Sequence, residues 1–249
     1  MTPYHSQYWA YALTIRGVAG SIENLTRSIS NARVDLNPHQ VDAALFALRS
    51  PLSKGTLLAD EVGLGKTIEA GIVLAQRWAE RRRRILVIVP ATLRKQWQQE
   101  LAEKFYLPTV VLDSRSFKQW QREGMANPFD QRERIVICSY NFASAKAKEI
   151  QALPWDVVVI DEAHRLRNVF RPSSKMARRI ADGIGQTPKL LLTATPLQNS
   201  LMELHGLVSV MDDQVANIRG TNERLTRASN RVAALGGLAS LATRGSQAA

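Results

Sequence analysis

The 249-residue chain lacks long hydrophobic runs, and its longest apolar stretches, such as residues 85–89 and 157–160, have only the length of strands. A membrane-spanning helix needs roughly 20 apolar residues, so the sequence predicts none. The first residues also lack the basic start and apolar stretch of a secretory signal. These absences argue against a membrane or secreted protein, and we expect a cytoplasmic one.

Cysteine and acidic residues are scarce as well. Cys138 is the single cysteine, and it lies within an apolar run, which favours a buried structural thiol over a catalytic one. The 33 Lys and Arg residues outnumber the 22 Asp and Glu residues, for a formal net charge of +11. That excess favours polyanionic partners such as nucleic acid. The four consecutive arginines at 81–84 fit this interpretation, but they equally fit a solvated helix end before a strand.

Short apolar runs alternate with longer helical patterns from residue 55 onward. The alternation predicts an α/β fold with a mostly parallel sheet, because the runs carry few polar residues, as strands covered by helices on both faces do. We therefore expect a RecA-like sandwich. The predicted strands are residues 56–58, 85–89, 110–112, 135–138, 157–160 and 190–192.

The domain organisation follows from changes in these patterns along the chain. At Asn37 and Pro38 a helix should begin, because asparagine is a good N-cap, proline suits the first helical position and Gln40 can close a capping box. The predicted parts are an accessory segment (1–35), one RecA-like domain (36–212) and a poorly ordered or partly helical basic tail (213–249).

The segment after the first predicted strand has the composition of a phosphate-binding loop. It reads Asp60-Glu61-Val62-Gly63-Leu64-Gly65-Lys66-Thr67. Its glycines let backbone N–H groups approach phosphates, and the following helix presents its positive N-terminal end. In a P-loop NTPase Lys66 would reach the β- and γ-phosphates of ATP, and Thr67 would ligate Mg²⁺. Asp60 replaces the first glycine of the strict pattern, so a glycine-rich turn with a surface lysine is the alternative.

A second polar group, Asp161-Glu162-Ala163-His164, follows the strand predicted at 157–160. Two adjacent carboxylates at the end of a buried strand are costly without a cation. Asp161 would hold Mg²⁺, and Glu162 would orient and polarise the attacking water. The alternative is a helix N-terminus decorated with acids, but the phosphate loop earlier in the chain favours the metal site.

Two threonines, Thr193 and Thr195, follow the strand predicted at 190–192. Their hydroxyls could hydrogen-bond the acidic pair or report its state. A threonine-capped turn explains them equally well on local grounds.

Taken together, these segments resemble the Swi/Snf-related branch of superfamily-two helicases, which includes DEAD/DEAH-box and bacterial RapA-like members. The matching stretches lie between residues 38 and 211, in the order of that family. They are Pro38-His39-Gln40, LLADEVGLGKTIEAG (57–71), ILVIVPATLRKQWQQE (85–100), ICSY (137–140), VVVIDEAHRLRN (157–168) and LLLTATPLQNSLMELHGLVSVM (190–211).

The resemblance implies an ATP hydrolase that uses ATP and Mg²⁺ and acts on nucleic acid, with double-stranded DNA favoured and RNA left open. Gln40 would read the adenine edge, and Lys66 and Glu162 would take part in hydrolysis. Residues 90–93 would contact the DNA backbone. The residues implied to couple nucleotide state to movement are His164, Thr193 and Thr195.

The resemblance also implies two RecA-like lobes that close around ATP, the second supplying arginine fingers. We find no second lobe in this sequence, because the family pattern fades near Met211. An arginine finger is worth roughly 10³ to 10⁵ in rate, so the chain should bind ATP far better than it hydrolyses it. The alternatives are a second lobe supplied in trans, a nucleotide-dependent binding module without productive hydrolysis, and the remnant of a disrupted gene.

Overall fold

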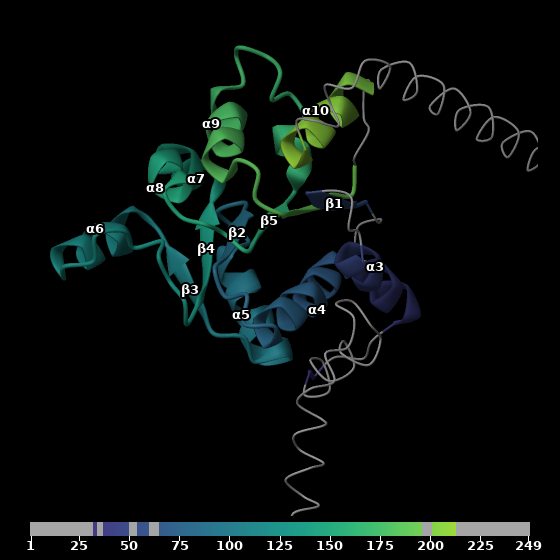
Figure 1. Cartoon of the computed structure of the whole chain (residues 1–249), viewed down its shortest axis with the longest axis horizontal. Coiled ribbons are helices and arrows are strands. Elements are labelled where there is room, and N and C mark those ends of the chain that lie inside the picture. The colour runs from purple at the N-terminus through teal and green to yellow at the C-terminus, as the bar shows by residue number, and fades with distance from the viewer. Residues whose placement is uncertain (1–31, 34–36, 50–53, 60–64, 196–200, 213–249) are drawn as a thin grey trace, which may run out of the picture.

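The computed structural model describes residues 32–33, 37–49, 54–59, 65–195 and 201–212. Within them a six-stranded sheet forms the middle layer, and helices cover both of its faces (Figure 1). The strands follow the order β1-β6-β5-β2-β4-β3, and every pairing is parallel. The predicted α/β sandwich is therefore confirmed.

The six apolar runs found in the sequence are the six strands, each extended by at most one residue. The strands are β1 (Gly55–Leu58), β2 (Ile85–Val89), β3 (Thr109–Leu112), β4 (Ile135–Ser139), β5 (Val157–Asp161) and β6 (Lys189–Leu192). The helices are α3 (Pro38–Arg49), α4 (Lys66–Ala79), α5 (Arg94–Phe105), α6 (Ser114–Arg122), α7 (Tyr140–Ala145), α8 (Ala147–Gln151), the 3₁₀ turn η1 (Ala163–Leu166), α9 (Lys175–Ile184) and α10 (Leu201–Met211). The helix start predicted at Pro38 is also confirmed.

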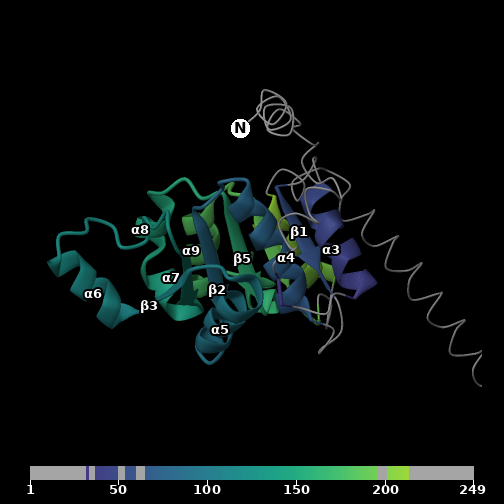
Figure 2. The same ribbon diagram turned by 90° about the horizontal axis from the view of Figure 1, so that it is seen from below.

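Strand β2 shows why the sheet lies at the centre. All five of its residues are buried. Because successive side chains point to opposite faces, Ile85, Val87 and Val89 join one hydrophobic cluster, whereas Leu86 and Ile88 join the other. The first cluster packs against α3, α4 and α5, and the second packs against the helices on the opposite face (Figure 2). Each fully buried side chain of this size contributes roughly 1.5–3 kcal/mol, so the run is stable only when covered on both sides.

Helix α4 ends in a Schellman turn built on an arginine. The Arg82 N–H donates to the Arg77 carbonyl (3.0 Å), and the Arg81 N–H donates to the Trp78 carbonyl (3.1 Å). Arg81 has a φ of 62°. Glycine usually fills this left-handed position, since an L side chain there costs roughly 1–2 kcal/mol. The arginine run thus lies between a helix end and a strand, and residues 81–83 are exposed.

Several sequence predictions lie outside the described residues. They concern the accessory segment before residue 32, the tail after residue 212 and the loop positions Asp60, Glu61, Val62, Gly63 and Leu64. Of the helices that the structure does describe, none combines the length and the apolar character needed to cross a membrane.

Cys138 is fully buried in β4. Burial raises the pKa of its thiol to about 12, because the thiolate would lose its hydration. This environment agrees with the structural role expected from the sequence.

Candidate nucleotide-binding site

Three neighbouring strands, β1, β6 and β5, end at the same edge of the sheet. Asp161 at the end of β5 is paired with Leu192 at the end of β6. The Thr193 N–H donates to the carbonyl of Leu58 at the end of β1 (3.1 Å), and α4 begins beyond β1 at Lys66. The polar residues predicted from three separate stretches therefore meet at the carboxyl edge, where open α/β sheets bind ligands.

Gly65 lies between the predicted phosphate loop and α4, and its backbone conformation suits glycine. Its φ of 91° and ψ of 34° lie in the left-handed region, and its carbonyl accepts the N–H groups of Ile68 (2.7 Å) and Glu69 (3.1 Å). A side chain at this position would overlap Nε2 of Gln40. Gln40 is buried and its Oε1 accepts the Asn37 N–H (3.3 Å). Gln40 thus closes the start of α3 as expected and also packs against Gly65, while its adenine-reading role stays a prediction.

Lys66 and Asp161 bring opposite charges to this edge. Burial is the largest influence on the Asp161 carboxyl and raises its pKa, whereas the hydrogen bond from Trp97 and the charge of Lys66 act in the other direction. A carboxylate in such a place is stabilised by a cation. Thr67 offers a hydroxyl in the first turn of α4. Carboxylate and hydroxyl oxygens beside phosphates are the donors that Mg²⁺ prefers, so these residues fit the ion.

Two buried aromatic residues hold the acidic pair, and the sequence predictions gave neither a role. Trp97 is 2% exposed, and its Nε1 donates to Asp161 Oδ2 (2.9 Å). The Tyr140 hydroxyl lies 2.6 Å from the Asp161 carbonyl oxygen and 3.1 Å from that of Glu162. Both aromatics follow strands within stretches that resemble the helicase family, and that position is the signal that could have found them.

Glu162 has a strained backbone, with φ 54° and ψ 46°. A non-glycine residue in this region costs roughly 1–2 kcal/mol, and such strain is concentrated at functional sites. The Glu162 N–H donates to Asp161 Oδ1 (2.8 Å), and Glu162 Oε2 lies 3.1 Å from His164 Nδ1. Only the 3₁₀ turn η1 follows, and Glu162 makes no side-chain cap to it. The alternative of an acid-decorated α-helix start therefore fits poorly.

The two threonines form a local turn. Thr193 is fully buried, and its Oγ1 accepts the Thr195 N–H (3.2 Å), while Thr195 is exposed. Among the described contacts, none joins either hydroxyl to the acidic pair. The geometry agrees with the threonine-capped turn, and the coupling role of Thr193 and Thr195 stays a prediction.

Comparison with known proteins supplies the family. The chain matches the SNF2-related domain over residues 25–241. It belongs to the SNF2-related family. A curated SNF2-related relative, the RNA polymerase-associated protein RapA of Erwinia tasmaniensis, is 40% identical over 185 residues. The match covers 72% of this chain but 19% of RapA, so the chain spans about one fifth of that relative.

A solved structure supports the same SNF2-related fold. The Sulfolobus solfataricus SWI2/SNF2 ATPase core in complex with dsDNA superimposes with a TM-score of 0.56 at 22% sequence identity. The match covers 73% of this chain and 36% of the Sulfolobus chain. The predicted RecA-like fold and the Swi/Snf-related resemblance are both confirmed, and the chain carries a helicase-like ATPase domain of this SNF2-related type.

Proposed function

We propose that the chain is the ATP-binding lobe of a DNA-dependent, helicase-like ATPase or translocase that uses Mg²⁺. The observation that carries this proposal is the convergence of Lys66, Asp161 and the strained Glu162 at one edge of the sheet. Phosphoryl transfer needs a phosphate-binding cation, a metal-binding carboxylate and a residue that orients water. These three side chains are of those three types.

In this proposal each residue has a separate task. Lys66 and the N–H groups at the start of α4 bind the phosphates, Thr67 and Asp161 hold Mg²⁺, and Glu162 orients the attacking water. When bound, Mg²⁺ neutralises charge on the phosphate oxygens. Trp97 fixes the Asp161 carboxylate through its indole N–H. The proposed nucleotide-binding set is Gln40, Asp60, Glu61, Val62, Gly63, Leu64, Gly65, Lys66 and Thr67.

We propose double-stranded DNA as the polymer, with RNA as the second choice, and the cytoplasm as the location. The net charge of +11 supports a polyanionic partner, and the Sulfolobus ATPase core was solved with dsDNA. We also propose that turnover depends on a second lobe, because the stretches that resemble the helicase family supply only one.

The direct test is ATP hydrolysis by the purified chain with and without duplex DNA, beside a titration with a fluorescent ATP analogue. Lys66→Ala should lose nucleotide binding and hydrolysis, because the phosphates lose their cation. Glu162→Gln should keep binding and lose hydrolysis. Lys148→Ala removes an exposed lysine from α8 and should change neither, which makes it the matched control.

The second candidate is a nucleotide-dependent binding module, in which ATP reshapes a basic surface without productive hydrolysis. This candidate is favoured if the nucleotide site acts with one lobe only, because the arginine fingers needed for hydrolysis would then be absent. A DNA affinity that changes with ATP, without turnover even after a second lobe is added, would identify the module. DNA-stimulated turnover that disappears in Glu162→Gln would identify the motor lobe. Absence of nucleotide binding would contradict both candidates.

A further inference from the structure

The sheet edge opposite the acidic pair carries guanidinium groups beside aromatic rings. Strands β2, β4 and β5 begin there, and Arg84, Arg134 and Asp156 immediately precede them. A strand rises about 3.3 Å per residue, so the length of β5 places this edge about 16 Å from Asp161. The side chains at this edge therefore cannot take part in the nucleotide site.

Four arginines at this edge surround a hollow of about 340 Å³, together with Pro154 and Asp156. Two contacts hold Arg84 in place. Its Nη2 lies 3.1 Å from Asp130 Oδ1, and its backbone N–H donates to Asp156 Oδ2 (2.9 Å). Arg81 and Arg83 also line the hollow and form no ion pair with any residue that the structure describes. Their charges are available to an anion in the hollow.

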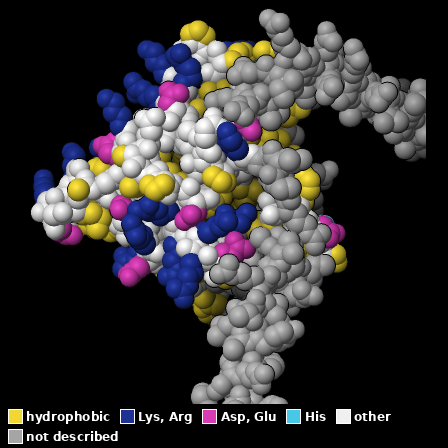
Figure 3. Space-filling model, viewed as in Figure 1, with side chains coloured by type: hydrophobic (Ala, Val, Ile, Leu, Met, Phe, Trp, Pro, Cys, Tyr) yellow, Lys and Arg dark blue, Asp and Glu magenta, His cyan; other side chains and the backbone are white. Residues whose placement is uncertain are grey.

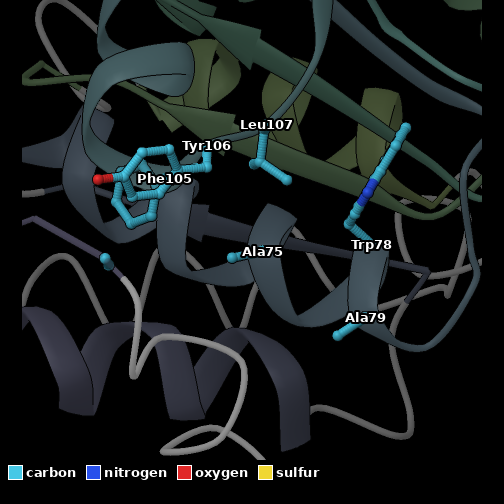
Figure 4. A pocket seen from close by; sticks show the side chains of 7 residues that line it. Ala75, Trp78, Ala79, Phe105, Tyr106 and Leu107 are labelled. Atoms are coloured by element: carbon cyan, nitrogen blue, oxygen red, sulfur yellow. The ribbon is translucent and has the colours of Figure 1, made fainter.

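A second hollow, of about 470 Å³, lies between α4 and the end of α5. Trp78 stands at one end of it and Phe105 and Tyr106 at the other, with the small side chain of Ala75 between them (Figure 4). Tyr106 is 53% exposed, and the Arg33 guanidinium lies over its ring, 5.4 Å from the centroid, so this aromatic side chain reaches solvent beside a further cation. Pockets of this volume accept small planar ligands, and aromatic walls favour stacking.

The two hollows are joined through Trp78. The Arg83 guanidinium lies over the Trp78 ring, 4.9 Å from its centroid, and Arg83 also lines the arginine hollow. One aromatic ring therefore supports a cation of the first hollow and forms a wall of the second. Such a pairing of stacking platforms with a positively charged track is how proteins bind single-stranded nucleic acid.

We propose that this arginine–aromatic surface, formed by Arg81, Arg83, Arg84, Arg132, Trp78 and Tyr106, binds an unpaired stretch of nucleic acid. A base stacks in the aromatic hollow while neighbouring phosphates contact the guanidinium groups, whose planar forks match phosphate oxygens. A duplex fits poorly because its base faces are already stacked on one another. An acidic peptide would satisfy the arginines and leave the aromatic hollow empty.

General electrostatic attraction has to be separated from this proposal. Lys and Arg side chains gather in several patches on the face shown in Figure 3, and any such patch attracts polyanions. The distinguishing feature is the base in the aromatic hollow. The backbone of Arg81 also supports a role for this surface, because an arginine occupies a left-handed turn position that favours glycine.

The test measures binding of fluorescent oligonucleotides of about 12 residues, within the range of small single-strand-binding folds. The full chain is titrated by fluorescence anisotropy without ATP or Mg²⁺. The ligands are a DNA strand, an RNA strand of equivalent sequence, a hairpin duplex and an abasic strand with equally many phosphates. The strands with bases should bind at least about fivefold tighter than the abasic strand, and the stronger of the DNA and RNA strands identifies the natural source.

Variants locate the binding. Tyr106→Ala, at an exposed position, should weaken the strands that have bases and leave the abasic strand unchanged. The double variant Arg81→Glu/Arg83→Glu should weaken all strands by at least about tenfold, because phosphate contacts are lost. Arg179→Glu reverses an exposed charge on α9, which covers the opposite face of the sheet, and should leave affinity within about twofold. Melting curves confirm that each variant is folded.

Four outcomes would overturn the proposal: equal binding of the abasic strand, an equal loss of hairpin and single-strand affinity in Tyr106→Ala, an unchanged affinity in the double arginine variant, or displacement of the strand by a glutamate-rich peptide of the same charge. Either of the first two would show that no base occupies the aromatic hollow. The third would show that the strand binds elsewhere on the chain, and the fourth would identify an acidic protein segment as the partner. Because no nucleotide is present, none of these outcomes bears on the ATP site.

Discussion

Replacing Tyr140 with phenylalanine removes a single oxygen atom and tests how the acidic pair is held. The hydroxyl lies 2.6 Å from the Asp161 carbonyl and 3.1 Å from the Glu162 carbonyl. The Glu162 carbonyl also accepts the Arg165 N–H (3.0 Å), so the loss falls mainly on Asp161. Burial raises the pKa of the Tyr140 hydroxyl well above its usual range, and the group therefore stays a donor at every physiological pH.

The expected effect has a stability part and a catalytic part. A buried carbonyl left without its donor costs about 1–3 kcal/mol, which for a domain of this size lowers Tm by roughly 2–12 °C. The hydroxyl also offsets the backbone strain of Glu162, roughly 1–2 kcal/mol. If Glu162 relaxes, its carboxylate leaves the position from which we propose that it orients water, and hydrolysis should fall about five- to thirtyfold.

The assay is single-turnover ATP hydrolysis at saturating DNA with a second lobe added in trans, beside nucleotide titration and thermal unfolding. ATP affinity should stay within about twofold, because Lys66 and Gly65 belong to a different element. Phe142→Leu, in the same helix as Tyr140 and packed against Phe117, is the control that should lower Tm alone. If Tyr140→Phe likewise lost stability and kept its hydrolysis rate, the reasoning that Tyr140 positions Glu162 would be refuted.

Three further changes have definite expected results. Gly65→Ala would overlap Gln40 and hold alanine at a φ of 91°, so ATP affinity should fall about five- to thirtyfold in a titration; unchanged affinity would show that the loop tolerates a side chain there. Gly206→Ala would overlap the Arg167 carbonyl and should lower the unfolding free energy by about 1–3 kcal/mol in urea; no loss would mean that α10 moves freely over η1. Asp113 caps α6, and the backbone N–H groups that donate to it lower its pKa. Its stabilisation is therefore present above the unfolded value near pH 4 and lost as pH falls through the folded value. Asp113→Ala should cost about 0.5–2 kcal/mol at pH 7 and less in acid, measured as the Tm difference from the wild type against pH.

The strands could be predicted because their information is local. A run such as residues 85–89 is apolar throughout, and that pattern indicates a strand buried on both faces wherever the strand lies in the sheet. The helix start at Pro38 is local in the same way, since Asn37 and Gln40 act within one turn. The strand order is different, because an apolar run says nothing about its neighbours. The placement of β6 between β1 and β5 could not be read from composition.

In the candidate site, too, the local features could be predicted from the sequence and the long-range contacts could not. Lys66 and Asp161 were found from short stretches, and the sheet brings them to one edge. The support around them was not found, because it depends on contacts between distant residues. Trp97 reaches Asp161 from 64 residues away and Tyr140 from 21, and the left-handed backbone of Glu162 is stable only in that setting. Their positions follow from the packing of α5 and α7 at the ends of β2 and β4.

The burial of Cys138 has a practical consequence. The chain has one cysteine, and that thiol is fully buried with a pKa of about 12, so thiol-reactive dyes should not modify the native protein. A cysteine engineered at an exposed position would then take up a single dye without removal of the natural residue. Fluorescence distances from the lobe to DNA could be measured in an otherwise unmodified chain, and labelling of Cys138 itself would report unfolding.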